Sequence, residues 1–158
     1  MTENYLQIMT ESLEKKIEVL DRIYEINKRQ FELSSARPFD AEAYDAIMDE
    51  KGELIETLER LDDGFTTTYE LIKDTVQKNP EQYRAQVLRM QELVRETVDK
   101  GVSIEAQEKR NKASMEVALS SKRMEMKEHR VSANAAVQYY NAVSKLNRVD
   151  PQLMDRKK

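Results

Sequence analysis

Three prolines, Pro38, Pro80 and Pro151, divide this chain of 158 residues into long segments with apolar side chains at three- and four-residue steps. Proline interrupts a helix because it lacks the backbone N–H and its ring clashes with the preceding turn. The first stripe reads Leu6, Met9, Leu13, Ile17, Leu20, Tyr24, Asn27 and Phe31, and the second reads Tyr44, Ile47, Lys51, Leu54, Leu58, Leu61, Phe65, Ile72 and Val76. Such steps place side chains on one helix face, and the second stripe has the spacing of a coiled-coil seam.

We expect helices at about residues 2–36, 40–78 and 80–147, followed by a short tail at 148–158. Thr2 and Asp40 are the expected N-caps of the first two helices, and Asn79, with Pro80 after it, is the expected start of the third. A helix over residues 80–147 would span about 100 Å, against roughly 50 and 60 Å for the others. The third helix therefore either folds back at Gly101, its one candidate break, or projects beyond its neighbours.

The predicted fold is all-α: an elongated antiparallel helical bundle or coiled coil of three long helices, or four if the third breaks near Gly101, in one domain spanning residues 1–158. Charged residues make up 35% of the chain, with only 3 Gly and 3 Pro, which is typical of long exposed helices. The absence of Cys excludes zinc ribbons, disulfide scaffolds and CxxC redox motifs. Without an apolar run of membrane-spanning length or a signal peptide, we expect a cytoplasmic protein with no membrane insertion.

The residue types needed for catalysis are scarce. His129 is the only histidine, whereas a di-iron bundle needs two Glu-x-x-His motifs and a nucleophilic triad needs an oriented base. No GxGxxG, GxxxxGK[ST] or HExxH motif occurs. The net charge of −4 and the alternation of Lys and Arg with Glu in the third segment argue against nucleic-acid binding. We therefore expect no enzyme and no catalytic, metal or cofactor site.

Charge is distributed unevenly along the chain. Residues 37–79 hold 5 basic and 12 acidic side chains, a net of −7, whereas residues 80–158 carry a net of +5. This asymmetry favours side-by-side packing of the second and third helices. Residues 131–144 contain no charged side chain at all. This uncharged window is either a buried helix of the bundle or a docking surface for another helix.

Two segments resemble a known family. Residues 43–65 contain the pattern E-K-x-x-L-I-x-x-L-x-x-L-D-x-G-F, from Glu50 to Phe65, which resembles FlgN-type flagellar export chaperones. Residues 101–112 are similar to the I-x-x-x-E-x-x-N run of the same family. Together with the helix layout, the resemblance covers most of residues 1–130, while the chain from Tyr140 onward departs from it.

The resemblance implies a non-enzymatic cytoplasmic chaperone. Such proteins bind the C-terminal helices of hook–filament junction proteins, prevent premature assembly and deliver these clients to the type III export gate. The uncharged window would cover the apolar stripe of the client, and the expected contacts are Val131, Ala135, Tyr139, Tyr140, Val143 and Leu146. Tyr139 or Tyr140 could also contact the export gate.

Two other functions fit the same sequence. One is a structural coiled-coil protein whose third helix pairs with a second copy in a homodimer. The other is a soluble component of the secretion apparatus, such as a stalk or an ATPase regulator. The sequence does not choose among these interaction proteins.

Overall fold

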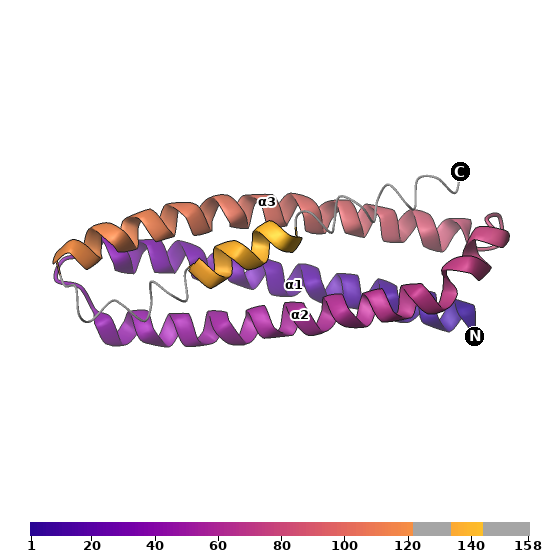
Figure 1. Ribbon diagram of the computed structural model, residues 1–158, viewed down its shortest axis with the longest axis horizontal. Helices are drawn as coiled ribbons and strands as arrows, with labels where there is room; N and C mark the ends of the chain where they lie inside the picture. The colour runs from indigo at the N-terminus through magenta and orange to yellow at the C-terminus, as the bar shows by residue number, and fades with distance from the viewer. Residues whose placement is uncertain (122–133, 144–158) are drawn as a thin grey trace.

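The computed structural model describes residues 1–121 and 134–143 and shows the predicted all-α, elongated antiparallel helical bundle (Figure 1). The three long helices are α1 (Thr2–Ser35), α2 (Ala41–Lys78) and α3 (Arg84–Ser121). Residues 134–143 form a short helix, which we call the return helix. No strand occurs in these described ranges. At a rise of 1.5 Å per residue, each long helix spans about 50–57 Å.

The connection between α1 and α2 forms near Pro38, as expected. Ala36 has left the helical conformation, and the Asp40 side chain caps α2 by accepting a hydrogen bond from the Ala43 N–H at 3.1 Å. The predicted N-cap at Asp40 is thus confirmed. The predicted N-cap at Thr2 is wrong, because Thr2 is already helical and Met1, which has no capping side chain, occupies the cap position.

The prediction that Asn79 and Pro80 begin the third helix is wrong. Asn79 instead ends α2, where its side-chain amide donates to Thr75 O at 2.8 Å. Carbonyls in the last turn of a helix lack partners within the helix, so this bond satisfies one of them. A turn follows as far as Tyr83, and the first hydrogen bond of α3 runs from Val87 N–H to Tyr83 O at 2.9 Å.

α3 continues through Gly101, so of the two alternatives left open by the sequence the break at this glycine does not occur. Val94 and Ile104, on either side, are both buried in clusters that contain residues of α1. Their packing outweighs the cost of about 1 kcal/mol that glycine carries in a helix. The predicted single helix over residues 80–147 is interrupted, because the described α3 ends at Ser121 and the return helix runs in the opposite direction (Figure 1).

α1 is the central helix of the three. It packs against both α2 and α3, whereas no Cα atom of α2 lies within 8 Å of a Cα atom of α3. α1 and α3 run parallel, and side chains 80 positions apart meet along their length. Asn27 Nδ2 donates to Gln107 Oε1 at 3.2 Å, and the hydroxyls of Ser34 and Ser114 lie 2.6 Å apart.

The predicted side-by-side packing of acidic α2 and basic α3 is therefore wrong. The basic residues of α3 pair with α1 instead: Lys100 lies 2.6 Å from Asp21, and Arg89 lies 3.6 Å from Glu14. Exposed pairs of this kind contribute at most about 1 kcal/mol each. Apolar packing on two sides of α1 decides the arrangement, and net helix charge does not.

The core consists of three apolar clusters along the bundle. The cluster nearest the N-terminus contains Leu6, Met9, Leu13, Phe65, Ile72, Val76, Tyr83, Met90, Leu93 and Val94. The middle cluster contains Val19, Leu20, Ile23, Ile26, Leu54, Leu58, Ile104, Ala136 and Tyr140. The third contains Leu33, Tyr44, Met48, Met115 and Ala118. The return helix therefore belongs to the core at its middle.

Candidate functional site

A trough between α2 and α3 is the most distinctive feature of the bundle. We give this name to the space that the return helix fills: α2 and α3 lie on either side of it, with no pair of their Cα atoms within 8 Å, and α1 lies beneath it. The return helix lies in this trough (Figure 1). Val143 also lines a pocket formed with side chains of all three long helices, including Leu13, Phe65 and Val94.

The return helix faces the trough with one apolar stripe. Ala136, Tyr140 and Val143 follow one another at steps of four and three and are all buried, with exposures of 1%, 1% and 9%. This spacing places them on one helix face. Gln138 and Ala142 point away from the bundle and are exposed.

Tyr139 makes a polar contact between the return helix and α2. Its hydroxyl donates a hydrogen bond to Asp62 Oδ2 at 3.0 Å, while the other oxygen of Asp62 lies 2.7 Å from Lys16 Nζ. Burial and the charge of Asp62 raise the pKa of Tyr139, which keeps its hydroxyl protonated as a donor. The rings of Tyr139 and Tyr140 meet edge to face, with centroids 5.3 Å apart.

The six predicted contact residues fall into three groups: Val131 and Leu146 lie outside the described residues, Ala135 is exposed, and Tyr139, Tyr140 and Val143 pack toward the bundle. Their contact with a partner stays a prediction. The geometry adds a condition, because Tyr140 and Val143 can reach a partner only if the return helix leaves the trough.

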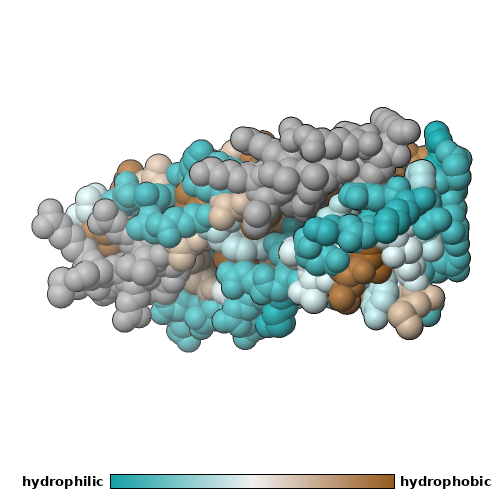
Figure 2. All heavy atoms as spheres, turned by 45° about the vertical axis from the view of Figure 1, so that its right-hand side comes forward, coloured by the Kyte–Doolittle hydropathy of each residue, from teal (hydrophilic) through white to brown (hydrophobic). Residues whose placement is uncertain are grey.

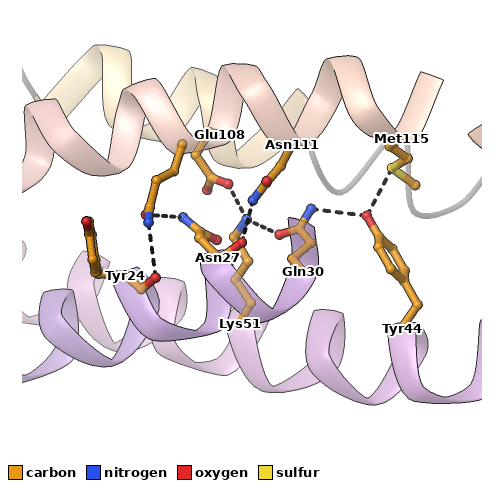
Figure 3. A network of polar contacts seen from close by, with 9 residues as sticks. Tyr24, Asn27, Gln30, Tyr44, Lys51, Glu108, Asn111 and Met115 are labelled. Carbon is orange, nitrogen blue, oxygen red and sulfur yellow. Dashed lines mark hydrogen bonds and ion pairs between the residues drawn. The ribbon is translucent and has the colours of Figure 1, made fainter. Parts of the chain in front are cut away.

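A layer of polar side chains occupies the bundle interior beside the middle cluster (Figure 3). Lys51 of α2 pairs with Glu108 of α3, and both side chains are 1% exposed. Lys51 Nζ also donates to Gln30 Oε1 at 2.9 Å, and Gln30 Nε2 donates to the hydroxyl of Tyr44 at 3.1 Å. That hydroxyl donates in turn to Met115 Sδ at 3.2 Å. One chain of contacts thus joins all three helices.

A second set of contacts joins the same layer to the backbone of α1. Asn111 Nδ2 donates to Asn27 O at 3.0 Å, and Gln107 Nε2 donates to Tyr24 O at 3.2 Å. Buried polar layers fix the register and partner choice of packed helices more than they add stability. The layer links α1 to α3 through pairs separated by 80 to 84 positions in the sequence.

Burial dominates the ionisation of the central pair. It raises the pKa of Glu108 against the opposing effect of Lys51, and it lowers the pKa of Lys51 against the opposing effect of Glu108. Burial also raises the pKa of Tyr44 to about 12, although the hydrogen bond from Gln30 acts in the other direction. These shifts follow from burial, and the ion pair with Lys51 satisfies one of the two carboxylate oxygens of Glu108.

Several buried polar atoms have no hydrogen-bond partner in the part of the chain that the structure describes: Asn27 Oδ1, Glu108 Oε2, Asn111 Oδ1, Asn134 Oδ1 and Tyr140 OH. Each such atom costs about 1–3 kcal/mol. Burying the Tyr140 side chain contributes a similar amount, about 1.5–3 kcal/mol. The unpaired hydroxyl therefore offsets part of what burial of the Tyr140 ring contributes to the docking of the return helix.

The two segments that carry the family resemblance meet at this layer. Lys51 belongs to residues 43–65, and Glu108 belongs to residues 101–112. The sequence placed Lys51 in the seam but did not predict its pairing, nor the burial of Gln30 and Asn111. A lysine at a seam position was the available signal, because a buried charge requires a partner.

Hydrophilic residues cover most of the coloured surface in Figure 2, interrupted by patches of hydrophobic residues. Exposed large apolar side chains occur on all three helices and include Ile8, Leu71, Leu88, Val102 and Val117. No helix in the described ranges is long and apolar enough to cross a membrane. Within the same residues, no group of His, Cys, Asp and Glu is arranged to hold a metal ion.

Comparison with protein-family models, with curated proteins and with solved structures finds no match for this chain.

Proposed function

We propose that this protein is a non-enzymatic cytoplasmic chaperone of flagellar assembly. It binds the C-terminal helices of hook–filament junction proteins, keeps them from assembling early and delivers them to the type III export gate. The proposal draws on the resemblance of residues 43–65 and 101–112 to FlgN-type chaperones. The structural observation that supports it is the trough, which accepts a short helix with a small apolar face.

The physical requirement for such a chaperone is a surface that covers an apolar helical stripe. A helix that awaits partners in a filament would otherwise expose this stripe to water, which favours aggregation. Helix-in-groove recognition meets the requirement through side chains at i, i+4 and i+7. The buried face of Ala136, Tyr140 and Val143 has this spacing, so the trough is already shaped for a helix.

The experiment is a titration of the full chain into fluorescently labelled C-terminal peptides of hook–filament junction proteins. We expect saturable binding with a Kd in the micromolar range or tighter. The control peptide carries Asp at two apolar stripe positions and should not bind. Absence of binding by any junction peptide at about 100 μM would overturn the proposed function.

The exposed Val102 and Val117 favour a second candidate, a structural coiled-coil protein that self-associates. Both lie on the outer surface of α3, with exposures of 52% and 64%. Light scattering of the full chain separates the two functions. A dimer that is lost in Val102→Asp with Val117→Asp, and that binds no junction peptide, would favour self-association.

A further inference from the structure

The return helix fits its trough well through apolar contacts and poorly through polar ones. Ala136 and Tyr140 share one cluster with residues of all three long helices. The hydroxyl of Tyr140, Asn134 Oδ1 and Glu108 Oε2 are nevertheless buried without a hydrogen-bond partner in the described part of the chain. Unpaired buried polar atoms oppose docking, because each had a partner in water. A segment docked in this way can be replaced by one that fits better.

The trough cannot stay empty when the return helix leaves. Ile23, Leu58 and Ile104 lie at its floor and walls, each with an exposure of 0%, in the same cluster as Ala136 and Tyr140. Removing the return helix would expose this apolar surface to water. Another helix that covers the same surface removes this cost, so exchange is favoured over simple opening.

We infer that the trough between α2 and α3 is the binding seat of a partner helix that replaces the return helix. This partner is an amphipathic helix whose buried face carries no charge and has one hydrogen-bond donor opposite Glu108. The inference rests on the proposed function, since it places the client helix on the molecule. It also changes the role of the uncharged window, which becomes a competitor of the client and not its contact surface.

The donor opposite Glu108 follows from the arrangement of the polar layer. One carboxylate oxygen of Glu108 accepts from Lys51, and the other has no partner among the described residues. Tyr140 lies close enough for the charge of Glu108 to raise the pKa of its hydroxyl, but no hydrogen bond joins the two. A neutral client side chain such as Gln at this position would supply the missing bond and so bind better than the return helix.

Amide hydrogen exchange on the unmodified full chain tests the exchange of helices. The probe is a junction-protein C-terminal peptide that binds in the titration above. We expect the amides of residues 134–143 to exchange faster when the peptide is bound, because the return helix has left the trough. Slower exchange of these amides in the complex would mean that the return helix contacts the client, and would overturn the inference.

Two substitutions test the same inference through the direction in which they change the affinity for the peptide. Tyr140→Ala and the milder Val143→Ala both weaken the seat of the return helix, and we expect either to tighten peptide binding by about three- to tenfold. Gln138→Ala, at an exposed position of the same helix, is the matched control and should leave the affinity unchanged. Weaker or unchanged binding in both variants, with the helical circular dichroism retained, would overturn the inference.

The two failures are distinguishable. Binding of junction peptides without faster exchange of residues 134–143 would overturn the inference and leave the proposed function standing. No binding by the unmodified chain or either variant would overturn the proposed function and the inference together.

For the donor, two peptides that differ only in Gln or Met at the centre of the stripe are compared. We expect Gln to bind about fivefold tighter, and this preference should vanish when Lys51→Met is combined with Glu108→Met. Equal binding of the two peptides would overturn the donor assignment.

Discussion

Replacing Lys51 with Met tests whether the central ion pair is required for stability or only avoids an unpaired buried charge. Lys51 and Glu108 are both 1% exposed, and one oxygen of Glu108 has no hydrogen-bond partner among the described residues even in the intact protein. Lys51→Met removes the partner of the other oxygen. The carboxyl of Glu108 is then buried without a counter-charge.

The expected cost of Lys51→Met is about 3–5 kcal/mol, the usual loss when one member of a buried pair is removed. For a chain of this size, about 2–4 °C of melting temperature is lost per kcal/mol, so the melting temperature should fall by roughly 6–20 °C. Combining Lys51→Met with Glu108→Met removes both charges and fills the space with side chains of similar length. The double variant should lie within about 1 kcal/mol of the unmodified protein, or above it.

Urea unfolding followed by circular dichroism at pH 7 measures these differences. The matched control is the surface pair Lys15 and Glu18, 3.5 Å apart with exposures of 59% and 68%, whose replacement by Met should cost no more than about 0.5 kcal/mol. The reasoning is refuted if Lys51→Met costs less than about 1 kcal/mol. It is also refuted if the double variant is as unstable as the single one, since the unpaired charge would then not be the cause.

Three further predictions concern pH, a helix glycine and a helix cap. In Lys51→Met, the raised pKa of Glu108 means that the folded state keeps a proton that the unfolded state releases above about pH 4.3. The free energy of unfolding should therefore be greatest below that pH and fall as the pH rises through the folded-state pKa of Glu108, by at most about 1.4 kcal/mol per pH unit. Urea midpoints measured between pH 4 and 8 test this, and they would show no such fall if the carboxyl were solvated. Gly101→Ala should raise stability by about 0.5–1 kcal/mol, because alanine favours the helix and no neighbouring atom lies within 4 Å of the added Cβ. A lower melting temperature of this variant would indicate that the position needs glycine. Asp40→Ala should cost about 1 kcal/mol of stability, because it removes the cap on α2. Asp49→Ala, at an exposed position of the same helix, is the control and should cost much less. Equal costs of the two variants in thermal unfolding would contradict the capping role of Asp40.

The seam of α2 could be predicted well because the residues that α2 buries lie close to one stripe, although they meet both α1 and the return helix. Tyr44, Lys51, Leu54, Leu58 and Phe65 were all placed in the predicted stripe, and all are buried. A single stripe at steps of three and four describes a helix that has one packing face. Met48 is the one buried residue of α2 that lies outside the predicted stripe, so the period of the apolar residues was nearly sufficient here.

The stripe predicted for α1 was less complete, since α1 is the central helix. Tyr24 belongs to the predicted stripe but is 38% exposed, whereas Val19 and Ile23 lie outside it and are buried. A helix that packs on two neighbours buries two faces, and one period cannot describe both. Which helix occupies the centre is a property of three-dimensional packing and is not encoded in the spacing of any one segment.

The amino-acid sequence alone determined that this chain forms long amphipathic helices, that α2 begins at Asp40 and that residues 131–144 lack charge. These are local properties of propensity, capping and period. Only the tertiary structure decided that Lys51 meets Glu108, 57 positions away, and that the return helix lies in the trough between α2 and α3. The physical reason is that a buried charge and an apolar face each require a partner, but the partner is chosen by how whole helices pack.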